Sequence, residues 1–220
     1  MNQVFIIGAA GGVGRRLVGK LTAQGDGVVA LHRQAEQAPL LRQAGAKPLL
    51  GDITHLSAPE LATLMKGCQT VVFSAGAGGK GGTERTSAVD GQGLEKAVAA
   101  AQLAGVGRFL LVSVFPEAWR DRPRHEEFEH YMRVKKLADV CLAESPLDWV
   151  ILRPGTLTDE PAKGVRLGLA LPYGTVSRDG VAGVLAALVA QPRVSQRILE
   201  VTDGTLTPWQ AVMHCLENAT

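Results

Sequence analysis

Short apolar runs alternate with amphipathic segments along the whole chain. The apolar runs have the length of buried strands, and turn-forming residues separate them from their neighbours. We therefore expect strands at residues 4–7, 28–32, 48–50, 70–74, 108–114, 149–153 and 197–201.

Helical patterns fill nearly every gap between these runs, at residues 12–23, 37–44, 59–66, 88–104, 126–143, 179–190 and 208–217. Strands and helices that alternate in this way predict βαβ units and a doubly wound, mainly parallel sheet of the α/β class. Residues typical of helix starts and stops support several boundaries, with Ser57 and Thr207 as starts and Gly25, Gly45, Gly67 and Gly105 as stops. Three irregular stretches, 76–85, 116–125 and 156–176, follow strand ends, where open parallel sheets bind ligands.

Composition narrows the class of protein. With 220 residues, of which 46% are hydrophobic, the chain suits one domain over residues 1–220, and residues 155–220 are expected to contribute partly to the substrate side. The net charge of +2 leaves no basic field for nucleic acid or an anionic membrane, so we expect neither as a partner. The first strand begins close to Met1 and no apolar run has the length of a membrane span, which predicts a cytoplasmic protein. No signal for an oligomeric state is present.

The first predicted strand runs directly into glycines at Gly8, Gly11 and Gly14. A strand, a glycine-rich turn and a helix present the unpaired N–H groups of the helix to a diphosphate. The glycines permit a tight turn, close approach of the phosphates and close packing of helix on strand. We expect Gly12 and Val13, which lie inside this turn, to contact the nucleotide cofactor as well.

The end of the second predicted strand favours NADP(H) over NAD(H). An acidic residue there would bind a free 2′-hydroxyl, but this chain has His32 and Arg33. A guanidinium pairs with a 2′-phosphate, although Arg33 could also be an exposed arginine that starts a helix. His32 is expected to pack near the adenine.

Two further strand ends offer cofactor contacts. Asp52 could bind the adenine amino group while Ile53 packs on the ring, although Asp52 fits a turn or helix-capping aspartate equally well. The small residues Ser74, Ala75 and Gly76 would let a ribose and a nicotinamide lie against the backbone.

These motifs together resemble the atypical short-chain dehydrogenase/reductases, and within them the small NAD(P)H-binding group that includes NmrA-like proteins and flavin or biliverdin reductases. The resemblance implies a Rossmann fold and spans nearly the whole chain. It is carried by the glycine turn, Arg33, residues 51–52, 90–91, 109–113, 152–158 and 177–182. It also places Pro154 among the cofactor contacts.

Tyr131 and Lys135 match the family's Tyr-x-x-x-Lys pair and lie one turn apart on a predicted helix. An ammonium beside a phenol favours the phenolate, so we expect Lys135 to lower the Tyr131 pKa and Tyr131 to protonate a carbonyl oxygen during hydride transfer. Lys135 would also hold the nicotinamide ribose, and the resemblance implies that Ser113 binds the substrate oxygen. A Tyr/Lys pair at this spacing also occurs by chance on charged helices.

The chain departs from the family pattern in two places. Val114 stands where a second serine or threonine is frequent, and the segment between Ser113 and Tyr131 is long, so this insertion either covers the active site or displaces it. His125 and His130 are interpreted as solvated helix residues. No cluster of histidine, cysteine and carboxylate has metal-ligand spacing, so no metal is expected.

Two functions remain open. The first is an NADPH-dependent oxidoreductase that reduces a small carbonyl, quinone or flavin-like acceptor, because the region after Pro154 is too short for a domain that binds a nucleotide sugar. The second is a non-catalytic NADP(H) sensor of the NmrA type. Tyr131 and Lys135 favour the enzyme, because a sensor needs no proton donor.

Overall fold

The computed structural model describes residues 2–78, 81–120, 123 and 125–217. Within these residues an eight-stranded sheet forms the centre of the molecule. Its order is β3 (Lys47–Leu50), β2 (Gly27–His32), β1 (Gln3–Ile7), β4 (Thr70–Phe73), β5 (Arg108–Val112), β6 (Asp148–Pro154), β10 (Arg197–Asp203) and β8 (Val165–Gly168). Neighbouring strands are parallel except for β8, which pairs antiparallel with β10. The predicted doubly wound, mainly parallel sheet is confirmed.

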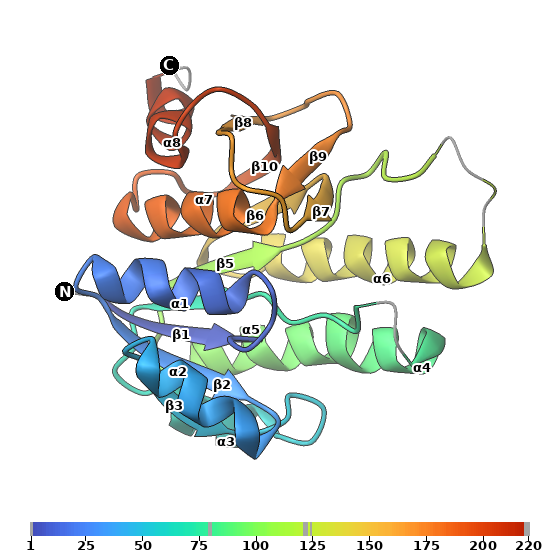
Figure 1. Ribbon diagram of the computed structural model, residues 1–220. Coiled ribbons are helices and arrows are strands. Elements are labelled where there is room, and N and C mark those ends of the chain that lie inside the picture. Colours follow the sequence, from blue (N-terminus) through green and yellow to red (C-terminus); the bar gives the residue numbers. More distant parts are fainter. Residues whose placement is uncertain (1, 79–80, 121–122, 124, 218–220) are drawn as a thin grey trace.

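Helices cover both faces of the sheet, as Figure 1 shows. The first face carries α1 (Gly14–Ala23), α2 (Ala38–Gln43), α7 (Arg178–Ala190) and α8 (Pro208–Glu217), and the second carries α3 (Ala58–Met65), α5 (Gly93–Ala104) and α6 (Glu126–Ala143). Side chains alternate along a strand, so Val4 and Ile6 of β1 belong to the first core whereas Phe5 and Ile7 belong to the second. The apolar runs are continuous because both faces of the sheet are buried.

Local signals explain where several helices begin and end. Ser57 accepts a hydrogen bond from the Glu60 N–H at 3.4 Å, and Glu60 bonds back to the Ser57 backbone at 2.9 Å, which forms a capping box at α3. The four predicted stop glycines all have positive φ angles: Gly25, Gly45, Gly67 and Gly105. These boundaries depend on local conformation, so the sequence predicts them well.

Two stretches expected to be irregular contain regular elements. Residues 156–176 hold β8 and most of a small parallel sheet formed by β7 (Thr156–Thr158) and β9 (Thr175–Ser177). Residues 76–85 include most of α4 (Gly82–Thr86), which continues into a π-helix over Ser87–Gln92 and then into α5. The strands escaped prediction because they are very short and their partners lie far away in the sequence.

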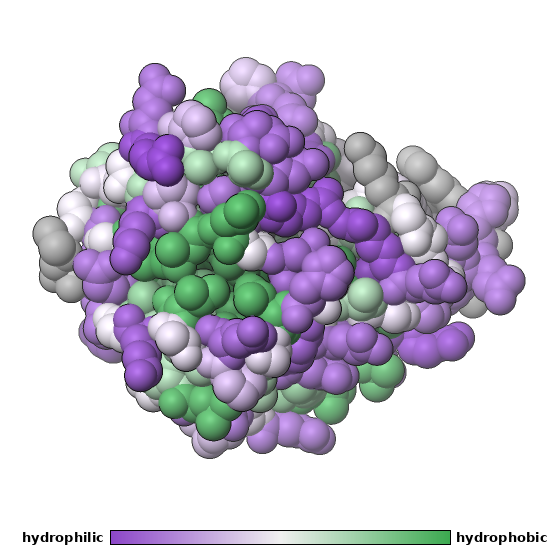
Figure 2. Space-filling model, turned by 90° about the horizontal axis from the view of Figure 1, so that it is seen from below, coloured by the Kyte–Doolittle hydropathy of each residue, from purple (hydrophilic) through white to green (hydrophobic). Residues whose placement is uncertain are grey.

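The surface is mixed on the side shown in Figure 2, with polar side chains around a central apolar area and smaller apolar areas below it. Leu50 in the edge strand β3 is 62% exposed, and Leu40 in α2 is 59% exposed. Among the described helices, none combines the length and the hydropathy needed to cross a bilayer.

Candidate cofactor and active site

Three glycines shape the turn between β1 and α1. Gly8 has a φ angle of +86°, and a Cβ atom there would lie 2.6 Å from the backbone nitrogen of Ala75, so only glycine fits. A Cβ atom on Gly14 would overlap the carbonyl oxygen of Gly8, so its absence lets α1 pack closely against the end of β1. Gly11 is exposed and donates its N–H to the Gly8 oxygen at 3.0 Å. The turn therefore presents the N-terminus of α1 at the carboxyl end of β1.

A cavity of about 220 Å³ opens beside this turn, at the carboxyl ends of β3, β2, β1 and β4. Nine of the residues predicted to bind the cofactor line it: Gly8, Gly11, His32, Arg33, Asp52, Ile53, Ser74, Ala75 and Gly76. Five others do not line it: Gly12, Val13, Gly14, Lys135 and Pro154. The parallel sheet brings the ends of these four strands together and so joins the predicted motifs, and the role of each residue stays a prediction.

His32 ends β2 and Arg33 follows it, at the position that the sequence predicts to read the ribose. His32 is buried, and its Nδ1 atom lies 2.9 Å from the carbonyl oxygen of Gln34. Arg33 is exposed and lines the cavity instead of starting a helix, since the next helical turn begins at Ala35. The position therefore places a guanidinium, and no carboxylate, at the rim of the cavity.

Asp52 stabilises a turn and also lines the cavity. Its Oδ1 atom accepts hydrogen bonds from the N–H and the hydroxyl of Thr54 at 2.9 and 2.8 Å. Burial alone would raise the Asp52 pKa, but the Thr54 bonds and the charges of His55 and Arg33 outweigh it and hold the pKa below its ordinary value. Asp52 is therefore an anion at neutral pH.

Sequence reasoning assigned no cofactor role to several residues of the cavity wall: Ile7, Ala10, Leu31, Gln37, Gly51, Arg85 and Val89. Most are apolar or small and belong to the strand ends already identified. Arg85 is different, because it is charged and comes from α4, inside a stretch expected to be irregular. No local pattern points to it.

Lys135 lies in a buried ion pair at the end of β5 and is not among the residues that line the cavity. Its Nζ atom is 3.6 Å from Oδ1 of Asp90 and donates to the Val112 carbonyl at 2.9 Å, and the two charged residues are only 3% and 2% exposed. The second oxygen of Asp90 accepts the Ala77 N–H at 2.9 Å. Asp90 thus links α6 to the loop after β4 that lines the cavity.

The structure does not give Tyr131 the lowered pKa that the sequence predicts. Burial raises the Tyr131 pKa above the ordinary value for tyrosine, and the carboxylates of Asp90 and Asp139 raise it further. The prediction that Lys135 lowers this pKa is wrong, because Asp90 balances the ammonium and Val112 binds it. Tyr131 is a neutral phenol at physiological pH.

Ser113 and His130 complete this region. Ser113 is 5% exposed, and its Oγ atom has no hydrogen-bond partner among the described residues. His130 is half-buried, with its Nε2 atom 2.8 Å from Oγ of Ser87, so the interpretation of His130 as a solvated residue is wrong. His125 is exposed, as expected.

Trp119 of the insertion before α6 stacks on Phe128, and the Phe128 ring is tilted against that of Tyr131. The Trp119 ring stacks on Phe128 with centroids 5.2 Å apart, and Phe128 lies 6.2 Å from the Tyr131 ring. Residues 121, 122 and 124 of the insertion lie outside the described residues. The described part of the insertion therefore packs beside the proposed proton donor.

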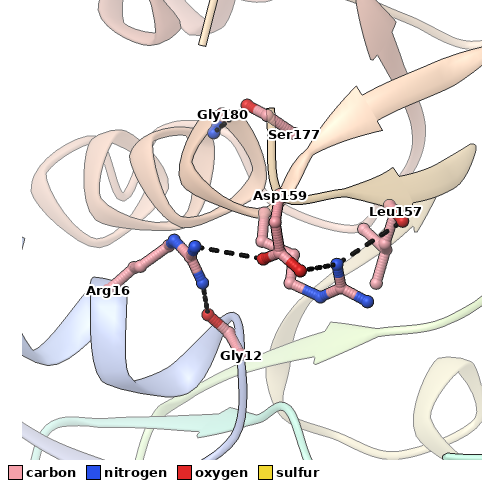
Figure 3. Close-up of polar contacts among 7 residues, drawn as sticks. Gly12, Arg16, Leu157, Asp159, Ser177 and Gly180 are labelled. Carbon is pink, nitrogen blue, oxygen red and sulfur yellow. Dashed lines mark hydrogen bonds and ion pairs between the residues drawn. The ribbon is translucent and has the colours of Figure 1, made fainter. Parts of the chain in front are cut away.

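A cluster of charges ties the C-terminal region to the glycine turn (Figure 3). Arg16 donates to the Gly12 carbonyl at 2.7 Å and to Asp159 at 3.1 Å, and Arg178 contacts the same carboxylate at 3.0 Å. A Cβ atom on Gly12 would lie 2.7 Å from Cδ of Arg178, so the arginine stem covers the turn. Asp159 directly follows β7, and this cluster holds that strand near the N-terminus of α1.

The glycine turn and its cavity belong to a region that matches a known family. Residues 8–192 match the model of the family described as NAD(P)H-binding. The chain belongs to this NAD(P)H-binding family. The predicted resemblance to the small NAD(P)H-binding group is therefore confirmed.

Similar proteins cover nearly the whole chain of this family member. An uncharacterized sugar epimerase of Bacillus subtilis, YhfK, is 37% identical over 204 residues, which cover 92% of this chain and 94% of that protein. The oxidoreductase ylbE from Lactococcus lactis is 26% identical with a TM-score of 0.84, covering 98% of this chain and 97% of its own. ChuY, an anaerobillin reductase from Escherichia coli O157:H7, is 25% identical with a TM-score of 0.77, covering 94% of this chain and 100% of its own.

The cavity of this NAD(P)H-binding protein fits the adenosine end of such a cofactor. The glycine turn supplies backbone N–H groups, and Arg33 and Arg85 supply cations. The apolar side chains of Leu31, Ile53 and Val89 supply surfaces on which an adenine ring can pack. The chemistry of the wall thus matches a ligand that combines an apolar ring with anionic groups.

Proposed function

We propose that this protein is an NADPH-dependent oxidoreductase that reduces a small carbonyl, quinone or flavin-like acceptor by hydride transfer. The observation that carries the proposal is the cavity at the glycine turn, where Arg33 occupies the position that reads the ribose. When bound there, the reduced cofactor supplies the hydride. Family membership supports the binding of NAD(P)H, and named relatives that are reductases or oxidoreductases support the reaction class.

The preference for NADP(H) over NAD(H) follows from charge. Asp52 is the sole acidic residue among those that line the cavity, and its Oδ1 atom already accepts two bonds from Thr54. Arg33 therefore meets a 2′-phosphate without a competing carboxylate at the ribose-reading position. An NAD-specific site would place an acidic residue there.

The chain's own residues supply the proton in this proposal. Tyr131 stays protonated because its pKa is raised, so its Oη atom can donate to a carbonyl oxygen that becomes an alkoxide. Ser113 has an unused hydroxyl at the end of β5, which could bind the same oxygen. Lys135 positions α6 against β5 through the Val112 carbonyl, and the proposed hold on the nicotinamide ribose would require it to share its remaining protons.

The C-terminal region favours a small or flat acceptor. After Pro154 the chain forms β8 and β10 of the main sheet, together with α7 and α8, which pack on the first core. Only the small β7–β9 sheet and its loops remain to enclose a substrate. A nucleotide sugar therefore lacks a binding domain here, although one relative is named as a sugar epimerase.

A specific observation also favours the second candidate, a non-catalytic NADP(H) sensor. The Lys135 ammonium is committed to Asp90 and Val112, and so does not activate Tyr131. A sensor would use the same cavity and transmit cofactor binding through the Asp90–Ala77 contact.

Titration calorimetry with NADPH and NADH tests the cofactor assignment. We expect the parent protein to bind NADPH more tightly, and we expect Arg33→Ala to weaken NADPH binding by about 1.5–3 kcal/mol while leaving NADH nearly unchanged. Equal losses for both cofactors would contradict the assignment. A parent protein whose melting temperature is unchanged by saturating cofactor would contradict nucleotide binding altogether.

A further inference from the structure

Two arginines reach the cavity from opposite sides of β1. Arg33 follows β2, and Arg85 lies on α4, which follows β4, while β1 stands between β2 and β4 in the sheet. Both side chains line the same cavity of about 220 Å³. Neither forms an ion pair within the described residues. The described residues that line the cavity therefore include two arginines and one acidic residue, Asp52.

The backbone around α4 places Arg85 against this cavity. Gly81 has a φ angle of +84°, and a Cβ atom there would lie 2.6 Å from Cδ of Arg85. The missing side chain leaves room for the arginine stem to lie across Gly81. Val89, one turn further along, also lines the cavity, so this face of the helical segment points to the ligand.

We propose that Arg85 is a second ligand for the 2′-phosphate of NADP(H) and determines cofactor specificity together with Arg33. A phosphate monoester carries nearly two negative charges at neutral pH, so two guanidinium groups balance it better than one. The diphosphate already has the N–H groups and the dipole at the start of α1. The 2′-phosphate is attached elsewhere on the adenosine ribose, and Arg33 and Arg85 are the described lining residues whose charge can balance it. This inference rests on the proposed preference for NADP(H).

Binding measurements on single variants separate the two arginines. We expect Arg85→Ala to weaken NADPH and the fragment 2′,5′-ADP about tenfold or more, and to leave NADH and 5′-AMP within roughly twofold. Arg85→Lys should recover part of the loss, because it keeps the charge and loses the planar fork. Arg42→Ala is the matched control, since Arg42 is exposed on α2 and does not line the cavity.

A double variant tests whether both arginines contact one phosphate. If they do, the losses from Arg33→Ala and Arg85→Ala should not add in the double variant. Thermal melting without ligand shows whether each variant is folded. If Arg85→Ala is unfolded, Arg85→Lys is used in its place. The readout is binding affinity, so it is independent of enzyme activity.

Three results would overturn the inference in different ways. Equal weakening of NADPH and NADH by Arg85→Ala would assign Arg85 to the diphosphate, and unchanged binding would remove it from the site. If Arg33→Ala abolishes the NADPH preference while Arg85→Ala keeps it, the Arg85 inference fails and the proposed function stands. A parent protein with no NADPH preference would refute both.

Discussion

The cofactor cavity and the region around the Lys135–Asp90 ion pair differ in whether their cations are already paired with a carboxylate. Arg33 and Arg85 line an open cavity and form no ion pair within the described residues. Lys135 is buried and already paired with Asp90. A cation is available to a ligand only where the fold has not neutralised it, so the residue type alone does not predict its role.

The same contrast separates two kinds of function. The cavity is ready to bind an anion, whereas the Lys135 region is built to hold α6, β5 and the Ala77 loop together. Tyr131 keeps its proton mainly because burial raises its pKa, and the carboxylates of Asp90 and Asp139 raise that pKa further. Substitutions in the cavity should therefore affect cofactor binding. Substitutions around the Lys135–Asp90 pair should affect stability and proton transfer, and should affect cofactor binding only through the proposed hold of Lys135 on the nicotinamide ribose.

The largest expected effect comes from removing the partner of Lys135. Asp90→Ala leaves a buried, unpaired ammonium, and should lower the free energy of unfolding by about 3–5 kcal/mol in urea denaturation. The double variant Asp90→Ala with Lys135→Met removes both charges and should recover most of the loss. A loss below about 1 kcal/mol for Asp90→Ala would show that water reaches the pair and that the two regions do not differ as described.

Proton donation by Tyr131 should give the next largest effect. Tyr131→Phe should lower turnover of a simple aldehyde or ketone by roughly 100-fold, with cofactor affinity within a few-fold. Lys135→Ala should reduce both turnover and cofactor binding. Because its pKa is raised above the ordinary value of 10.0, Tyr131 should cause no alkaline loss of activity below about pH 10.

The assay for Tyr131 should include a quinone and a flavin, since hydride transfer to these acceptors does not require the phenol. Activity on all acceptors that survives both substitutions would refute the assigned pair. No activity of the parent protein on any of them would favour the NADP(H) sensor.

Substitutions of two glycines in the cofactor turn should differ in their effects on folding stability and on cofactor binding. Gly14→Val places atoms against the Gly8 oxygen and the Ala9 backbone, and should destabilise the fold by about 1–3 kcal/mol. Gly11 is exposed, and its Cβ position is 3.1 Å from the Gly8 oxygen, so Gly11→Val should change stability less while blocking the phosphates. Thermal melting with and without NADPH measures both effects. A normal ligand-induced shift in Gly11→Val would contradict the placement of the phosphates.

The smallest effect is expected at Asp159, an exposed counterpart to Asp90. Its side chain is 65% exposed between Arg16 and Arg178, where water screens the charges. Asp159→Asn should therefore change the free energy of unfolding by less than about 1 kcal/mol. A loss as large as that of Asp90→Ala would show that the cluster is a main support of the β7 region.

The predictable parts of the fold were those coded by neighbouring residues. The strands of the parallel sheet read as apolar runs because both of their faces are buried, and the stop glycines mark turns with positive φ angles. β8 pairs with β10 across a long stretch of chain, and its four residues carry too little pattern to be recognised. α4 is similarly short, so the sequence predicted neither this helix nor the position of Arg85 on it.

The sequence by itself determined the doubly wound sheet, the glycine turn and the main set of residues around the cofactor cavity, because each follows from local periodicity or a contiguous motif. Only the tertiary structure decided which charges remain available. Asp90 and Lys135 lie far apart in the chain but meet in the interior, where each must be paired because burial penalises an isolated charge. Arg85 reaches the cavity from α4, which packs against the π-helix and α6, so its placement is set by packing and not by local sequence.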